Sequence, residues 1–157
     1  YLYNTAYFRD HNFKFATGRT HEDFGLIPWV ILNAKSILCI NDVLYYNVMS
    51  TNSIMRSNVY SKEVKKAQDV LFHVASLRKL LNQSSFDQST KDLFVTYLVH
   101  TVISKLELLN HKDQAVLTKQ IHQQGLLKNL PNTGWRKKIK NLLIRISPKL
   151  YLRMTRI

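Results

Sequence analysis

The chain has 157 residues, of which 45% are hydrophobic and 11% aromatic, a composition typical of a folded domain rather than of a disordered segment. Four glycines and three prolines exclude collagen-like and linker-like sequences. A single cysteine excludes a disulfide scaffold and a zinc site built from several thiolates. The charge is strongly positive, because 23 basic residues face 10 acidic ones, for a net charge of +13.

This positive charge is concentrated towards the carboxyl end. All ten acidic residues lie at or before Asp113, together with 13 of the 23 basic residues, whereas residues 114–157 hold ten basic residues and no acidic one. A cationic segment of this kind favours anionic partners, such as lipid headgroups, nucleic acid or an acidic protein surface.

The first residues do not have the pattern of a targeting signal. Tyr1–Thr5 contain no Met, no cationic region and no apolar run, so we do not interpret them as a signal peptide, and we expect the chain to be part of a longer protein. No stretch approaches the roughly 18 consecutive apolar residues that a membrane-spanning helix requires.

The first predicted elements are a short strand and a helix. Phe13-Lys14-Phe15 alternates as a strand does, within an aromatic-rich stretch. Apolar residues at helical spacing predict a helix over residues 21–34, with Pro28 inside it. We expect Thr20 to be its N-cap and Asp23 to stand at the third helical position, which is the spacing of a capping box.

Two strands or a hairpin follow, and after them the chain is predicted to be helical. The runs at residues 36–40 and 43–46 are rich in β-branched and aromatic residues and are separated by a turn. The later helices that the apolar spacing predicts cover residues 61–82, 86–109, 112–124 and about 135–146.

The order of motifs between residues 18 and 55 resembles one known enzyme family. Gly18-Arg19-Thr20-His21-Glu22-Asp23-Phe24 leads into a helix, and Asn33–Ile37, Ile40–Tyr46 and Thr51–Met55 follow in turn. This succession is similar to the second half of family-2 glycosyltransferases of the GT-A fold, particularly bacterial surface-polysaccharide enzymes. The resemblance covers about residues 1–57, but Asn47 and Val48 stand where the family often has a further Tyr and an Arg.

The resemblance implies an acceptor-side role for the Glu-Asp pair. In the family, the Asp of this pair deprotonates the acceptor hydroxyl that attacks the anomeric carbon of the donor sugar, and it corresponds to Asp23. Glu22 and His21 would bind the acceptor, and Trp29 is a candidate either for stacking on a sugar or for packing in the core. The alternative is that Asp23 caps its own helix and Glu22 favours the helix dipole.

The resemblance also implies cofactors that these residues do not supply. The family binds a nucleotide-sugar donor and a divalent metal, Mg²⁺ or Mn²⁺, mainly through an N-terminal half, where the metal acts as a Lewis acid. The 157 residues contain no Asp-x-Asp and no glycine-rich phosphate loop, so we expect this chain alone to be inactive. The six histidines lack metal-ligand spacing, and Cys39 is predicted to be a core residue.

The last segment has the pattern of a helix that lies in the plane of a membrane. Apolar residues recur at helical spacing between Ile139 and Ile146, and the cations lie mostly off this stripe. The predicted membrane contacts are Trp135, Arg136, Lys137, Lys140 and Arg145. The alternative is a helix docked on the rest of the protein with a solvated basic face.

Together these patterns predict an α+β fold class that is mainly helical. Residues 1–57 would be the acceptor-side, C-terminal part of a GT-A catalytic domain with a Rossmann-like sheet, residues 58–130 a helical bundle, and residues 131–157 the basic amphipathic segment. The predicted protein transfers a sugar to a glycan or lipid-linked acceptor in cell-surface polysaccharide synthesis, in the cytoplasm and peripheral on the inner face of the plasma membrane. The alternative is a basic helical module that binds nucleic acid or protein without catalysis, but no helix-turn-helix or RNA-binding signature is present.

Overall fold

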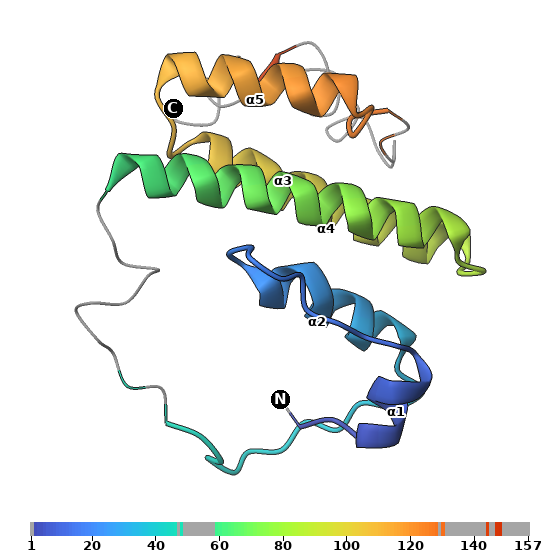
Figure 1. Cartoon of the computed structure of the whole chain (residues 1–157). Coiled ribbons are helices and arrows are strands. Elements are labelled where there is room, and N and C mark those ends of the chain that lie inside the picture. Colours follow the sequence, from blue (N-terminus) through green and yellow to red (C-terminus); the bar gives the residue numbers. More distant parts are fainter. Residues whose placement is uncertain are drawn as a thin grey trace.

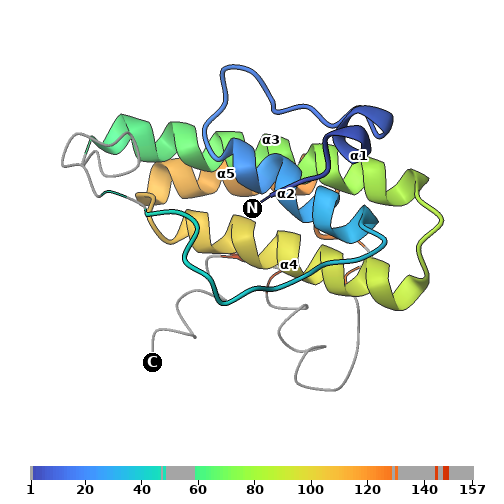
Figure 2. The same ribbon diagram turned by 90° about the horizontal axis from the view of Figure 1, so that it is seen from below.

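The computed structural model describes residues 2–46, 48, 59–128, 130, 144, 147 and 148. Its helices in chain order are α1 (Thr5–Asp10), α2 (Glu22–Asn33), α3 (Tyr60–Gln83), α4 (Gln88–Leu106) and α5 (His111–Gln123). The helices α3 and α4 form an antiparallel pair, with α2 packed on one side of the pair and α5 on the other (Figures 1 and 2).

The core lies within this stack because the apolar stripes of the long helices face one another. Its most deeply buried side chains include Val74 and Leu77 of α3, Leu98 of α4 and Leu117 of α5. The predicted helices over residues 61–82, 86–109 and 112–124 are therefore confirmed to within three residues at each end.

Side-chain caps fix where two of these helices begin. The carboxylate of Asp87 accepts a hydrogen bond from the Thr90 amide at the start of α4, and the side chain of Asn110 accepts one from the Asp113 amide at the start of α5.

The predicted α+β fold class is wrong, because the described residues contain no β-strand and no Rossmann-like part of the GT-A type. Phe13–Phe15 lie in a loop that follows α1, and residues 36–46 run as an extended chain. A strand needs a neighbouring strand to complete its backbone ladder, and in the part of the chain that the structure describes no backbone hydrogen bond joins residues 36–40 to residues 43–46.

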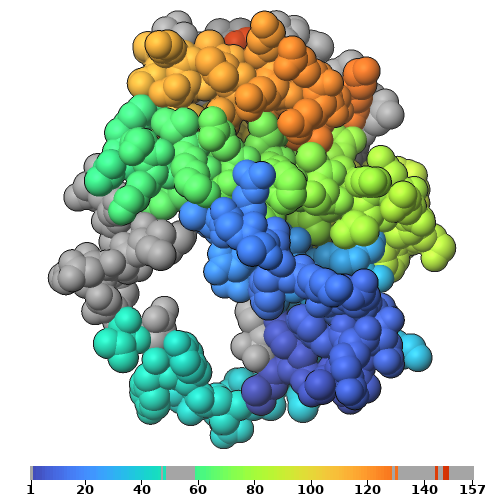
Figure 3. Space-filling model, in the orientation of Figure 1, coloured from blue at the N-terminus to red at the C-terminus, as the bar shows by residue number. Residues whose placement is uncertain are grey.

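This extended segment also leaves its apolar side chains in solvent. Leu38 is 86% exposed and Tyr46 is 80% exposed, and in the space-filling view residues 36–46 lie beside the N-terminal residues and away from α3, α4 and α5 (Figure 3). The prediction that Cys39 is a core residue is likewise wrong, because its side chain is exposed.

Most of the basic segment falls outside the described residues. These include every predicted membrane contact, namely Trp135, Arg136, Lys137, Lys140 and Arg145. Within residues 131–157, Ile144 is described and is buried in the helical core. Among the described helices, none combines the length and the apolar character needed to cross a bilayer.

Candidate functional site

The turn that leads into α2 is attached to α3 by a buried carboxylate. Asp69 of α3 is 1% exposed, and its two oxygens receive hydrogen bonds from the Arg19 guanidinium at 2.9 Å, the Thr20 amide at 2.9 Å and the Thr20 hydroxyl at 3.0 Å. Lys65, one helical turn before Asp69, donates a fourth hydrogen bond at 2.6 Å. Two residues of the turn are thus held by one side chain of another helix.

The charges around Asp69 keep it ionised. Burial alone would raise the pKa of its carboxyl, but the hydrogen bonds from Lys65, Thr20 and Arg19 outweigh burial and hold that pKa well below its usual range. The Arg19 guanidinium also lies 4.4 Å from the centre of the Phe72 ring, which adds a cation–π contact between the turn and α3.

A buried histidine provides a second attachment. His73 is four residues after Asp69 on α3, and its Nε2 donates a hydrogen bond of 3.0 Å to the Thr20 carbonyl. The ring of His73 fits against α2 only because position 25 is glycine. A Cβ at Gly25 would lie 2.2 Å from His73 Nδ1, which is far inside van der Waals contact.

The predicted capping box at the start of α2 is not formed. The N-cap is His21, in a left-handed conformation with φ of 57°, and it makes no side-chain capping bond. Thr20 is displaced from the capping role because its hydroxyl donates to Asp69 instead. In the described part of the protein, no hydrogen bond or ion pair engages the carboxylate of Asp23, which lies exposed in the first turn of α2.

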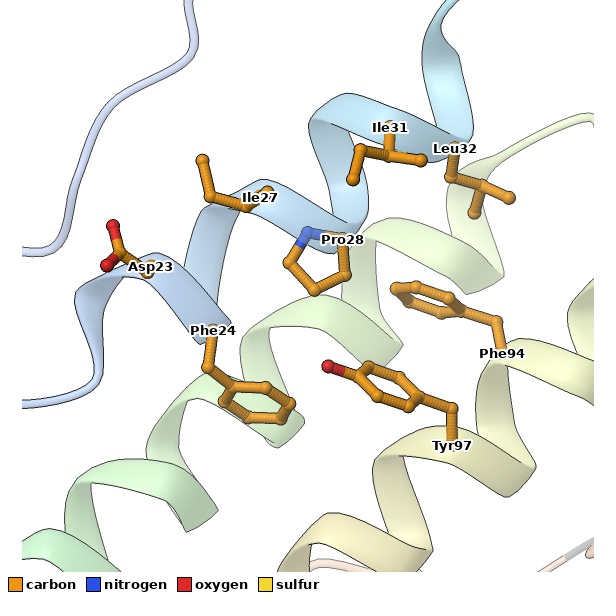
Figure 4. Close-up of a pocket in the computed structure, with 8 residues that line it drawn as sticks. All are labelled: Asp23, Phe24, Ile27, Pro28, Ile31, Leu32, Phe94 and Tyr97. Carbon is orange, nitrogen blue, oxygen red and sulfur yellow. The ribbon is translucent and has the colours of Figure 1, made fainter. Parts of the chain in front are cut away.

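A groove runs from Asp23 along α2 and is closed on its far side by α4. Its volume is about 550 Å³. Its lining residues are Asp23, Phe24, Ile27, Pro28, Ile31, Leu32, Phe94 and Tyr97. Figure 4 shows Asp23 at the start of α2 with its carboxylate directed away from the rings of Phe24 and Tyr97, while Phe94 and Tyr97 face α2 from α4. The site is therefore an open apolar groove in which Asp23 is the one acidic lining residue.

The other predicted acceptor residues lie in different surroundings. Glu22 is exposed in the first turn of α2 beside Asp23. Trp29 packs edge-on against Phe86 at a ring distance of 5.9 Å and contacts Phe94, so it joins the α2–α4 packing and does not line the groove.

His21 is partly buried, and its Nε2 is enclosed without a hydrogen-bond partner in the described residues. Burial is the main cause that lowers the pKa of His21, and the positive charges of Lys105 and Lys66 lower it further, so the fold favours the neutral ring. A left-handed backbone at a residue other than glycine is a strained feature of the kind that clusters at functional sites.

The described residues do not offer a metal site. Among them, no group of three His, Cys, Asp or Glu side chains comes together that could hold a metal ion. The predicted Mg²⁺ or Mn²⁺ therefore has no fitting ligands in this part of the chain.

Sequence reasoning found the Glu-Asp pair but missed the residues that hold it. Asp69 and His73 lie four apart on α3 and so share one face, each directly before a buried valine of the core, Val70 or Val74. Two polar side chains at helical spacing beside an apolar stripe are the signal that could have identified them.

No family model, no curated protein and no solved structure matches the chain in the three comparisons with known proteins.

Proposed function

We propose that this chain supplies the acceptor side of an inverting glycosyltransferase, with Asp23 as the general base. The observation that carries the proposal is the position of Asp23, since its carboxylate has no partner in the described residues, lines one end of a groove, and follows directly on the turn that α3 holds in place. A carboxylate that already capped its own helix would be less available to a substrate.

In the proposed reaction, a hydroxyl of the acceptor attacks the anomeric carbon of the donor sugar. A new carbon–oxygen bond forms as the bond to the nucleotide diphosphate breaks, and the electron pair leaves with the diphosphate. Asp23 accepts the hydroxyl proton, which requires the carboxylate to be ionised and within hydrogen-bond reach of the acceptor. Neighbouring residues on a helix do not face each other, so Glu22 would contact a different part of the acceptor.

The apolar walls of the groove favour a lipid-linked acceptor over a free glycan. Phe24 follows Asp23 on α2 and lines the groove. Tyr97 lines it from α4, with its ring centre 5.9 Å from that of Phe24. Ligand sites of this size are commonly lined by apolar side chains with a few polar groups that fix orientation. A lipid-linked acceptor would place its hydroxyl at Asp23 and its apolar chain along the groove.

The remaining parts of the sequence-based hypothesis stay predictions. The nucleotide-sugar donor and its divalent metal would be bound by residues other than those described, and the anionic membrane contact depends on residues 131–157. A location on the inner face of the plasma membrane depends on the same segment.

The test is sugar transfer by the full-length gene product. Radiolabelled UDP-glucose, UDP-galactose and UDP-N-acetylglucosamine are offered with a polyprenyl-diphosphate-linked N-acetylglucosamine acceptor. We expect Asp23→Asn to lower kcat by about 10³-fold, within the range of general-base catalysis, and to leave donor binding unchanged. Asp42→Asn, at another exposed aspartate, is the control and keeps wild-type activity. Transfer by Asp23→Asn within twofold of wild type, or no transfer by the wild type from any of these donors, would contradict the proposal.

A further inference from the structure

We infer that Asp69 is a positioning residue for Asp23, acting from α3 through the turn at residues 18–21. The inference rests on the proposed function, because it concerns how the proposed base is aimed. Asp69 does not line the groove, so any effect on catalysis must pass through the turn that it holds.

The first step is that α2 does not fix its own start. Its N-cap His21 makes no side-chain capping bond, and a left-handed conformation is costly for a residue other than glycine. This conformation persists because surrounding contacts impose it. The direction in which the first turn of α2 presents Asp23 is therefore set from outside the helix.

The second step is that the imposing contacts come from α3. Side chains of α3 bond to three successive residues of the turn. Lys65 donates a hydrogen bond of 3.4 Å to the Gly18 carbonyl and another to Asp69, and Asp69 accepts hydrogen bonds from Arg19 and Thr20. The Thr20 residue is held on both sides, with its amide and hydroxyl on Asp69 and its carbonyl on His73. Only His21 and Glu22 separate Thr20 from Asp23.

The third step is that the attachment of Arg19 and Thr20 to α3 depends on the negative charge of Asp69. Asp69 is an acceptor for all four of its bonds, two of them from cations, and charge-assisted bonds of this kind are about twice as strong as neutral ones. A neutral amide in its place presents one oxygen and two N–H donors, so it cannot accept the same set. Asp69→Asn therefore loosens the turn while keeping the size of the side chain.

The experiment separates positioning from folding by its kinetic signature. In the full-length protein, with the donor and acceptor named above, we expect Asp69→Asn to lower kcat by about 10²-fold while the donor KM stays within twofold, because misplacing a catalytic group by about 1 Å has an effect of this size. Thr20→Val, which removes one bond and leaves α3 intact, is expected to lower kcat about tenfold, and it carries the test if Asp69→Asn does not fold.

The controls are two variants on the opposite side of α3. Asp113→Asn removes a carboxylate that accepts a hydrogen bond from Tyr60 at 2.6 Å, and Ile121→Val lowers stability from the buried face of α5. Both are expected to keep kcat within twofold of wild type. A loss of kcat in Asp69→Asn and Thr20→Val no greater than in these controls would overturn the inference.

Failure of the inference and failure of the proposed function are distinguishable. If Asp23→Asn is inactive but Asp69→Asn and Thr20→Val keep wild-type kcat, the base assignment stands and positioning by Asp69 is wrong. If Asp23→Asn keeps wild-type activity, the proposed function itself is wrong.

Discussion

Two neighbouring regions of the chain differ sharply in how much of the molecule holds them. The turn and first helical residues at 18–25 are bound to α3 by hydrogen bonds, ion pairs and close packing. The segment at 36–46 is extended, and its apolar side chains face solvent. The first region leads into the start of α2, and the second follows the other end of that helix (Figure 1).

The difference shows what local pattern can and cannot determine. The turn of polar residues at 18–21 is held in place because two buried side chains of α3 bond to it. Asp69 accepts hydrogen bonds from the turn, and His73 donates one to it. A run of strand-forming residues remains extended without becoming a strand, because no described backbone lies beside it to complete a ladder.

The largest expected effect is that of a methyl group at position 25. Gly25→Ala is expected to lower the free energy of unfolding by about 3 kcal/mol, because the added Cβ would displace His73 and break its bond to Thr20. Urea denaturation of both proteins gives the difference. The control is Gly18→Ala, where the Cβ meets nothing within 4 Å and only the positive φ opposes it, at about 1 kcal/mol.

Helix propensity alone predicts the opposite sign, since alanine favours a helix over glycine by about 1 kcal/mol. A stabilised Gly25→Ala protein would therefore show that α2 does not pack on His73.

The second prediction concerns the charge of Asp69. Asp69→Asn is expected to lower the free energy of unfolding by about 2 kcal/mol near pH 7, less than for a fully buried pair because Arg19 and Lys65 are partly exposed and rehydrate. Because the pKa of Asp69 is lowered in the folded state, its contribution is complete above the ordinary carboxyl pKa and is lost as pH falls below it. Thermal unfolding between pH 7 and pH 3 should thus be less pH-dependent in the variant, and equal slopes would contradict the assignment.

A smaller effect is expected from His21. Its lowered pKa means that folding favours the neutral ring, so this contribution to stability is present above pH 6.5 and is lost as pH falls through the folded-state pKa. His21→Asn, with a side chain that tolerates the left-handed conformation, should reduce the fall in Tm between pH 7 and pH 5. The control is His122→Asn on α5, and an identical effect of both substitutions would argue against a buried ring at His21.

The smallest effect is expected in the extended segment. Leu38→Ser is expected to change the free energy of unfolding by less than about 0.5 kcal/mol, as for other exposed positions that make few contacts. Urea denaturation provides the measurement, and Leu98→Ser, at a fully buried position of α4, is the contrasting variant. A destabilisation by Leu38→Ser of more than about 1 kcal/mol would mean that the segment packs against the helices.

The long helices could be predicted from the sequence because their information is local. The spacing of residues such as Val74, Leu77 and Leu98 defines apolar faces without knowledge of the partner. The structure of the segment at 36–46 could not be predicted in this way, because strand formation depends on a neighbouring strand that the segment's own residues do not specify. The capping box failed for a similar reason, since a residue 49 positions away, Asp69, competes for the Thr20 hydroxyl.

For the candidate site, the sequence pointed to Asp23 through a resemblance. The structure adds the groove that Asp23 lines and the contacts that attach the preceding turn to α3. The groove depends on how α2 crosses α4, which brings Phe24 towards Tyr97. Such a pairing of residues far apart in the chain has no signature in either segment alone.

Native-state hydrogen exchange of the Thr20 amide tests most directly whether α3 holds the turn that precedes Asp23. This amide donates to the buried carboxylate of Asp69, whereas the amides of residues 37–46 have no described backbone partner. We predict that the Thr20 amide exchanges at least about 10²-fold more slowly than those of residues 37–46, and that Asp69→Asn abolishes the difference. Exchange of the wild-type Thr20 amide as fast as that of residues 37–46 would contradict the attachment.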